Sequence, residues 1–268
     1  MATRTLRPIS TAPRSHGWRW ALLGILLGSA LTLTVFAPAR WLATFLRTQT
    51  QGHLLLVNPR GTVWNGTAGV VFASGAGGGD AISLPGALAW RLRPDWQGVA
   101  ARLDLSCCTA EPLGLKARPA AGGVRLSLLD GRSRWPAALL AGFGAPWNTL
   151  KPEGVLDLST RDLVLAFRGR TMAFDGQATL DATDISSSLS TLRPMGSYRV
   201  VLDGGSASSM ILTTRDGSLR LSGSGRWNGT ALRFSGEASA APGREDALSN
   251  LLNIIGRRDG ARSIITLG

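Results

Sequence analysis

The stretch Trp18–Phe36 constrains this chain more than any other part of its sequence. It carries no charged residue after Arg19 and consists mainly of Leu, Ala, Gly and Thr. At a rise of about 1.5 Å per residue, a helix of this length measures roughly 28 Å, which matches the hydrocarbon thickness of a bilayer. Trp18, Trp20 and Trp41 lie near its two ends, and an indole ring suits the membrane–water interface. We therefore predict one transmembrane helix over residues 18–37.

The charges that flank this stretch predict its orientation. Four arginines lie before it or at its start, whereas the first acidic residue of the chain is Asp80. Because basic residues favour the cytoplasmic side, residues 1–17 are expected to be a cytoplasmic tail and the bulk of the chain is expected to be exported. Residues 38–52 are expected to form a linker helix that leaves the membrane, and residues 53–268 the exported domain.

A cleavable signal peptide is the alternative interpretation of the same pattern. A basic segment, an apolar run and a small-residue site at Ala37-Pro38-Ala39 are typical of such a peptide. The apolar run is at or beyond the upper length of a signal peptide's apolar region, which favours a retained anchor. Both interpretations export residues 40–268.

The exported part has the composition of a β protein. The chain contains 34 Gly and 13 Pro, with 44% hydrophobic and 17% charged residues, which argues against disorder and against a helical bundle. Short alternating apolar runs follow one another at roughly ten-residue spacing, as in an antiparallel sheet with one wet face. We therefore predict an all-β fold with short helices near residues 134–144 and 245–258. The predicted strands are 54–57, 61–72, 87–92, 99–105, 113–118, 124–128, 155–158, 163–168, 172–180, 198–202, 210–214, 218–222, 231–234 and 263–267.

One pentapeptide, Trp-Asn-Gly-Thr-Ala, occurs twice, at Trp64–Ala68 and at Trp227–Ala231. Asn-Gly between alternating apolar runs is a strong hairpin signal, because both residues tolerate positive φ. We therefore expect two tight hairpin turns, each with its tryptophan packed inward.

The two cysteines, Cys107 and Cys108, are adjacent. Neighbouring Cα atoms are about 3.8 Å apart, which excludes an ordinary disulfide staple. A strained disulfide between the two adjacent cysteines is an alternative, and a redox role could follow from it. The favoured interpretation is that the cysteines are two small side chains of one strand, on opposite faces of the sheet. They are then dispensable for folding and for secretion.

The charge and the motifs do not indicate catalysis or nucleic-acid binding. The net charge is +12, but the basic residues are scattered along the chain, so no nucleic-acid partner is expected. The chain has two histidines and no hydrolase, zinc-protease or phosphate-loop motif, so no catalytic residue, metal or cofactor is expected. A hydrolase is a weaker hypothesis, and it rests on the recurring carboxylates Asp157, Asp162, Asp175, Asp181 and Asp184. Aspartate is also an ordinary turn residue.

The segment near the C-terminus predicts an amphipathic helix. Its apolar residues form a one-sided stripe that must be buried. Covering the open end of the sheet is one role for this stripe, and docking a partner subunit is the other. The candidate partner-contact residues are Leu248, Leu251, Leu252 and Ile255.

Five segments in this order and spacing resemble protein N of the bacterial type II secretion system. They are Asn58–Gly66, Leu84–Leu92, Gly144–Gly154, Met195–Val200 and Leu251–Arg258, and the likeness extends over roughly residues 20–266. No single segment is a chemical signature, and the adjacent cysteines depart from the family's pattern.

The resemblance implies a non-catalytic accessory component of the inner-membrane assembly of that system, which exports folded proteins across the outer membrane. It implies a single-pass inner-membrane protein with its bulk in the periplasm and with other inner-membrane subunits as partners. A more distant likeness to AsmA-like proteins implies a large curved antiparallel sheet, groove-like or sandwich-like. The alternative function, lipid handling or envelope maintenance by an apolar β-groove, follows from that second likeness.

Overall fold

The computed structural model describes residues 17–73, 75 and 81–268, so nearly all of the expected cytoplasmic tail lies outside the described residues. The chain divides into two compact units, residues 1–37 and 38–268. The described part of the first unit contains one helix, α1 (Gly17–Val35), which is long and apolar enough to cross a membrane. The hydroxyls of Thr32 and Thr34 each donate to a carbonyl four residues back, at 2.8 Å. These two hydroxyls therefore need no water, which suits an apolar medium.

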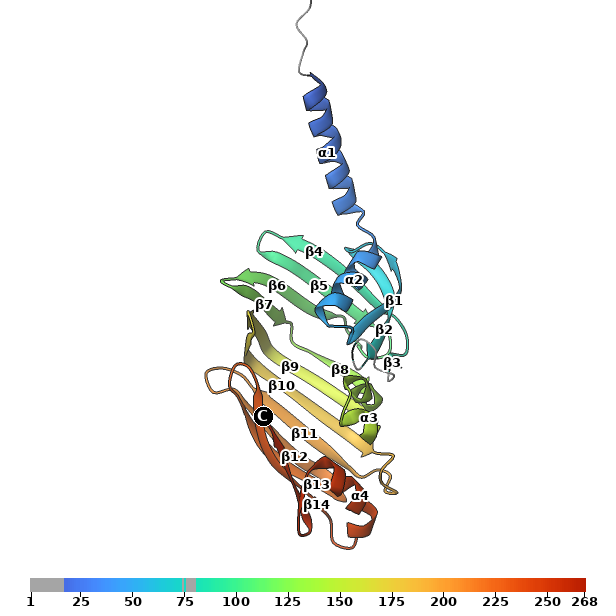
Figure 1. Ribbon diagram of the computed structural model, residues 1–268, viewed down its shortest axis with the longest axis vertical. Helices are drawn as coiled ribbons and strands as arrows, with labels where there is room; N and C mark the ends of the chain where they lie inside the picture. The colour runs from blue at the N-terminus through green and yellow to red at the C-terminus, as the bar shows by residue number, and fades with distance from the viewer. Residues whose placement is uncertain (1–16, 74, 76–80) are drawn as a thin grey trace, which may run out of the picture. The chain divides into compact units, whose positions relative to one another are not determined.

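The second unit is built on one 16-stranded sheet (Figure 1). Every strand pair is antiparallel, and in the described part of the chain β1 and β15 are the two edges of a sheet that does not close. The order across the sheet is β1-β2-β4-β5-β6-β7-β9-β10-β11-β12-β13-β14-β16-β15, with β3 against β2 and β8 against β9. The strands are β1 (Leu54–Gly61), β2 (Asn65–Ala73), β3 (Ala81–Ser83), β4 (Leu88–Asp95), β5 (Gly98–Leu105), β6 (Leu113–Ala120), β7 (Gly123–Leu128), β8 (Gly131–Pro136), β9 (Glu153–Arg168), β10 (Thr171–Ser186), β11 (Gly196–Asp203), β12 (Ser209–Gly217), β13 (Leu219–Trp227), β14 (Leu232–Ala240), β15 (Arg257–Asp259) and β16 (Arg262–Leu267).

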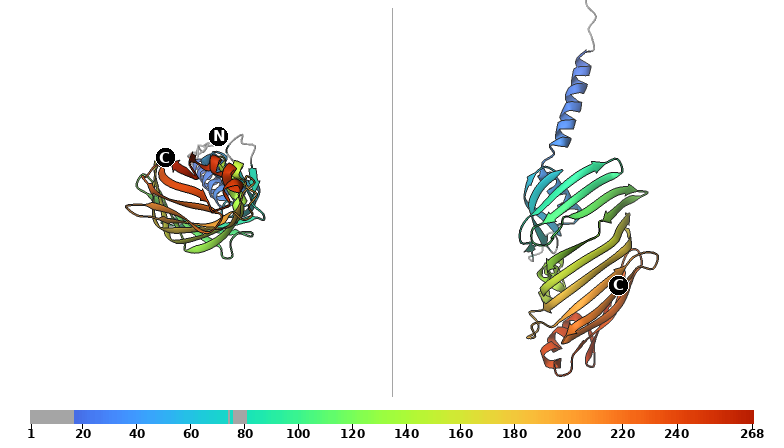
Figure 2. Two further views of the ribbon diagram at one scale, coloured as in Figure 1. Left: turned by 90° about the horizontal axis from the view of Figure 1, so that it is seen from below. Right: turned by 180° about the vertical axis from the view of Figure 1, so that it is seen from behind.

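The predicted fold class is confirmed, and the sheet is a single curved layer (Figure 2). Most strands pair with a neighbour in sequence, since short turns join antiparallel strands readily. Four helical segments accompany the sheet: α2 (Ala39–Gln49), the 3-10 helix η1 (Ala137–Phe143), α3 (Trp147–Leu150) and α4 (Glu245–Ile255).

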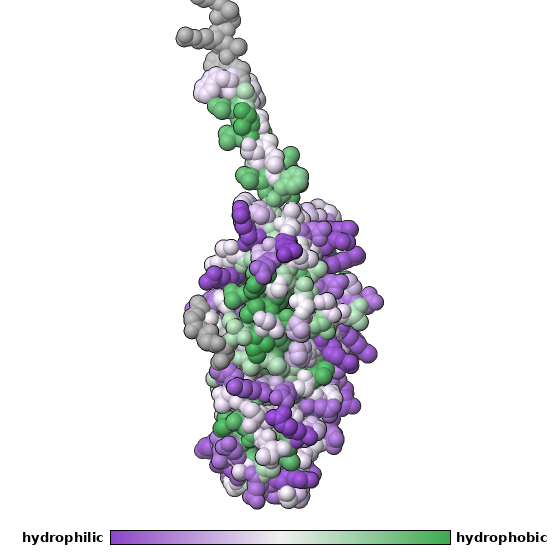
Figure 3. All heavy atoms as spheres, turned by 90° about the vertical axis from the view of Figure 1, so that its right-hand side faces the viewer, coloured by the Kyte–Doolittle hydropathy of each residue, from purple (hydrophilic) through white to green (hydrophobic). Residues whose placement is uncertain are grey.

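The two faces of the sheet differ because side chains alternate along each strand. One face, called the inner face below, carries two clusters of buried apolar residues. The N-terminal cluster joins α2 and η1 to strands β1–β5, and the C-terminal cluster joins α3 and α4 to strands β10–β14 and β16. Each leucine that is fully buried there stabilises the fold by about 1.5–3 kcal/mol. The opposite face is called the outer face. A space-filling view of one side of this unit shows apolar residues in a band between hydrophilic flanks (Figure 3).

Two long strands correct the prediction of several short ones. Residues 155–158 and 163–168 both belong to β9, and the polar break between them is an irregularity inside the strand. Asp162 has φ of 49°, and its backbone N–H donates to the carboxylate of Asp130 at 2.6 Å. Opposite it, Gly176 of β10 has φ of 84°. Asp and Gly therefore serve here as bulge residues rather than as turn residues.

The predicted helix at 134–144 begins later than expected. Residues 134–136 end strand β8, in which Trp135 pairs with Leu156. Pro136 then precedes the 3-10 helix η1, so the proline does stand at a helix start. The predicted helix at 245–258 is α4, which ends at Ile255.

The two identical pentapeptides adopt different structures. At the second copy the predicted hairpin turn is confirmed: Asn228 and Gly229 open the four-residue β13–β14 turn, residues 228–231, and Gly229 has φ of 95°. The side-chain oxygen of Asn228 accepts from the backbone N–H groups of Thr230 and Ala231 at 3.0 and 2.8 Å. The tryptophan of this copy, Trp227, is half-buried and its indole N–H donates to a backbone carbonyl.

At the first copy the predicted turn position is wrong. Residues 62–64 make the connection between β1 and β2, and Asn65 and Gly66 already lie in β2. Gly66 is opposite Gly61 in the register, and a Cβ atom on Gly66 would lie 2.5 Å from the Trp90 ring. The glycine is therefore needed for a close approach between strands rather than for a positive φ.

The cysteine pair also differs from the favoured interpretation. Cys107 and Cys108 lie in the turn after β5 and are joined by a disulfide. Cys107 is exposed, whereas Cys108 is buried in the N-terminal cluster and its carbonyl accepts from the Arg134 backbone N–H at 2.8 Å. The pair thus links the β5 turn to strand β8.

Candidate interaction surfaces

A row of charged residues crosses the outer face of the sheet at β8, β9, β10 and β11. The sheet register places Arg134, Asp157, Asp181 and Arg199 opposite one another in succession. Two carboxylates are therefore neighbours on adjacent strands, which alone would be unfavourable. An arginine at each end of the row compensates for this.

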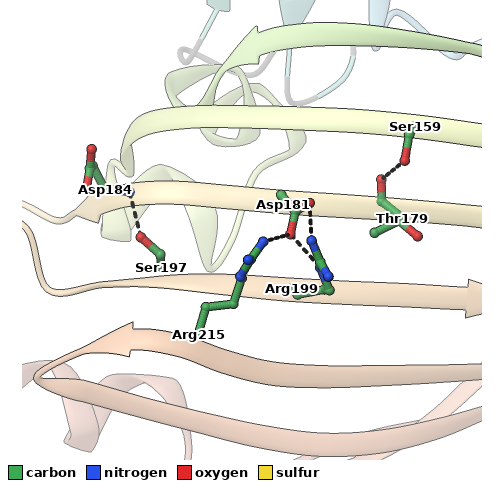
Figure 4. Close-up of polar contacts among 7 residues, drawn as sticks. All are labelled: Ser159, Thr179, Asp181, Asp184, Ser197, Arg199 and Arg215. Atoms are coloured by element: carbon green, nitrogen blue, oxygen red, sulfur yellow. Dashed lines mark hydrogen bonds and ion pairs between the residues drawn. The ribbon is translucent and has the colours of Figure 1, made fainter.

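The contacts within the row are short. Arg134 Nε is 2.8 Å from Asp157 Oδ1. Arg199 binds Asp181 through two hydrogen bonds, Nε to Oδ1 at 2.7 Å and Nη2 to Oδ2 at 2.8 Å (Figure 4). Arg215 of β12 adds a third, weaker contact to Asp181 Oδ1 at 3.2 Å. This pattern is the bidentate geometry that arginine favours with carboxylates.

The electrostatics of Asp181 follow from these contacts. Hydrogen bonds from Arg199 hold the pKa of Asp181 below its ordinary value, against an opposing effect of partial burial. The charges of Arg199 and Arg215 lower this pKa further. Since the Asp181 side chain is 26% exposed and both arginines are more exposed, the row contributes modestly to stability. Its ion pairs join β8 to β9, and β10 to β11 and β12.

All four residues of this row line an open groove of about 750 Å³. The groove is lined by the Cys107–Cys108 disulfide, by Arg132 and Arg134 of β8, and by polar residues of β9–β11. Guanidinium groups, carboxylates and hydroxyls on one wall can bind a polar segment of another chain through hydrogen bonds.

A second surface on the outer face is strongly basic. Arg91 of β4 lies opposite Arg102 of β5, and Arg118 of β6 lies opposite Arg125 of β7. All four side chains are exposed, and none forms an ion pair with any residue that the structure describes. Like charges directly opposite each other are destabilising by a few tenths of a kcal/mol or more, so this basic surface is suited to an anionic partner. We call it the β4–β7 basic surface.

The arginines are scattered along the sequence, but on the β4–β7 basic surface they are not scattered in space. They are separated along the chain, but the antiparallel register brings them together in pairs. The signal that could have found them is their period of two on the predicted strands, which places them all on the wet face.

The predicted partner-contact residues lie on the covered side of α4. Leu248, Leu251 and Leu252 are at most 2% exposed, and Ile255 packs against the same C-terminal cluster. Two buried serines fasten the helix: Ser190 Oγ donates to the Ala247 carbonyl at 3.0 Å, and Ser263 Oγ donates to the Leu252 carbonyl. The stripe therefore covers the inner face within this chain. Partner contact through these residues stays a prediction, and it requires α4 to leave the sheet.

The recurring carboxylates do not converge into one cluster. Asp157 and Asp181 meet in the row described above, whereas Asp162 and Asp184 have positive φ at strand irregularities and Asp175 lies opposite Val164. Within residues 17–73, 75 and 81–268, no three His, Cys, Asp or Glu side chains are grouped so that they could hold a metal ion.

Comparison with known families identifies one match. The family described as "Type II secretion system (T2SS), protein N" matches residues 52–265, which is most of the chain and nearly all of the β unit. No curated protein and no solved structure matches the chain.

Proposed function

This chain belongs to the type II secretion system protein N family, and we propose that it is a non-catalytic component of that system's inner-membrane assembly. Membership implies an accessory component in protein secretion, which interacts with other parts of the secretion system. The family match over residues 52–265 is the observation that carries the proposal. Two parts of the proposal go further, namely the location in the inner membrane and action by protein contact alone. The apolar helix α1 supports the location, and the ion-paired and basic surfaces of the sheet support action by contact.

The proposed topology places one transmembrane helix, residues 18–37, in the inner membrane. α1 supports this span through its length, its apolar surface and its internally bonded threonines. The arginines before it favour a cytoplasmic tail over residues 1–17, with the linker helix region 38–52 and the β domain 53–268 in the periplasm.

Two features of the β unit favour action by contact. The residues of its charged row form ion pairs with one another. The carboxylate of this row with two arginine partners, Asp181, has a lowered pKa, so it suits a permanently charged structural group rather than a proton donor. The β4–β7 basic surface offers a docking site for an acidic face of another secretion subunit.

Deletion of the gene tests the proposed function. Folded exoproteins should accumulate in the periplasm or leave the cell more slowly, while envelope permeability stays normal. Under the lipid-handling alternative, the same deletion should raise detergent sensitivity while secretion proceeds unchanged, and that outcome would overturn the proposal. Complementation with the wild-type gene is the control.

The proposed topology has its own test. Reporter enzymes that are active only in the periplasm, fused after residue 268, should be active. N-terminal sequencing of the mature protein should show that residues 18–37 are retained, whereas a start at Arg40 would show a cleaved signal peptide.

A further inference from the structure

Helix α2 presents two chemically different faces. Ala39, Leu42, Ala43 and Leu46 pack against the N-terminal cluster, so this face is fully used within the chain. On the opposite face two aromatic side chains, one helical turn apart, stay exposed: Trp41 is 49% and Phe45 is 58% exposed. A helix that leaves its two largest apolar side chains in water has a second apolar contact to make.

The remaining side chains of the exposed face suit a lipid headgroup region. The Thr44 and Thr48 hydroxyls donate to carbonyls four residues back, each at 2.9 Å, so these hydroxyls keep their hydrogen bonds when water is excluded. The basic residues Arg40 and Arg47 stand two turns apart on one flank and are exposed, and α2 contains no acidic residue. Aromatic residues beside arginines are typical of helices that lie in the interface plane.

The length of the chain before α2 restricts where the helix can be. α1 ends at Val35 and α2 begins at Ala39, so three residues separate the two helices. Three residues span at most about 10 Å, and the headgroup region beside each face of the hydrocarbon core is roughly 5–8 Å thick. If α1 spans the bilayer, the first turn of α2 starts within or beside that region.

We propose that the exposed face of α2 lies on the inner membrane at its periplasmic side, with Trp41 and Phe45 inserted among the headgroups and Arg40 and Arg47 on anionic lipid phosphates. The proposal rests on the proposed function only in taking α1 as the span. Because the other face of α2 belongs to the N-terminal cluster, this contact restrains the whole β unit at the membrane surface. The linker helix α2 thereby orients the β unit relative to the membrane.

Spin labels on the full chain in lipid nanodiscs test this proposal. The labelled positions are Phe45 and, as a matched control, Phe143, which is also 58% exposed but lies at the end of η1. The variants F45C and F143C are labelled without reductant, so that the Cys107–Cys108 disulfide stays closed. The discs contain phosphatidylethanolamine and phosphatidylglycerol, and the label's collision rates with oxygen and with a water-soluble nickel chelate are compared.

We expect the oxygen-to-nickel ratio at position 45 to exceed that at position 143 by at least about threefold, as for a side chain inserted among the headgroups down to the acyl boundary. Replacing Arg40 and Arg47 with Gln, or using phosphatidylcholine alone, should lower the ratio at position 45. If the chain enters the discs but both labels are aqueous, the α2 contact is refuted while the α1 span survives; a protein partner is then the occupant to seek. If both labels are immersed, contact is not specific to α2 and the proposal fails. If the chain does not enter the discs, the span itself fails.

Discussion

The two copies of Trp-Asn-Gly-Thr-Ala provide a matched experiment on why a glycine is needed. The changes are Gly66→Ala and Gly229→Ala, which add one methyl group to the same local sequence. At Gly66 the new Cβ would lie 2.5 Å from the Arg60 carbonyl oxygen and 2.5 Å from the ring of Trp90. At Gly229 no atom lies within 4 Å of the new Cβ, but φ is 95°.

The expected magnitudes differ because the physical causes differ. Overpacking against backbone and a buried ring costs about 1–3 kcal/mol, and here both neighbours are fixed: Trp90 is 3% exposed and its indole N–H donates to the Val63 carbonyl at 3.0 Å. We therefore expect Gly66→Ala to lower the free energy of unfolding by about 2–3 kcal/mol. Backbone strain at Gly229 should cost about 1 kcal/mol.

Urea unfolding of the full chain in detergent, followed by tryptophan fluorescence, measures both values under one condition. A double-mutant cycle with Trp90→Phe isolates the ring contact, because a smaller ring relieves part of the clash at Gly66 and should leave Gly229→Ala unaffected. Equal destabilisation by the two glycine variants, or additive behaviour of Gly66→Ala with Trp90→Phe, would refute the account of the first copy.

Three further predictions concern the row, the disulfide and α4. Asp181→Asn should destabilise the fold by less than about 1 kcal/mol near neutral pH. Because the folded pKa of Asp181 is lowered, its contribution is present above the unfolded pKa of about 3.9 and is lost as the pH falls through the folded pKa, so wild-type and variant unfolding curves should converge in acid. Mass spectrometry without reductant should show no alkylation of Cys107 or Cys108. Their joint replacement by Ser should cost only about 1 kcal/mol, since the closed loop is minimal, and secretion should continue. Leu251→Ala should destabilise the fold by about 2–4 kcal/mol whereas the exposed Ile254→Ala should not; loss of secretion by Leu251→Ala at full stability would instead indicate partner contact.

Much of this fold could be predicted from periodicity alone. Local sequence patterns predict the alternating strands, the helix of membrane-spanning length and the amphipathic segment at 245–258, because each depends on side chains that are close together in the chain. The long strands β9 and β10 could not be predicted in this way. Asp162 and Gly176 have the composition of turn residues, and only their position opposite each other across a ladder makes them bulge residues.

The candidate surfaces depend on register, and register depends on contacts that are distant in sequence. Arg91 and Arg102, or Asp157 and Asp181, become neighbours only when a strand pairing is chosen, and a shift by one residue would move each to the other face. The same reasoning explains the repeated pentapeptide: its first copy is held as strand by Trp90 of β4, while its second copy has no such neighbour and forms the turn that its composition favours. The two copies have the same local propensity for a turn, and packing against the buried Trp90 ring overrides this propensity in the first copy. The β4–β7 basic surface also depends on register, because the pairing places like charges opposite each other at a cost in stability. Contact with an anionic partner would remove that cost.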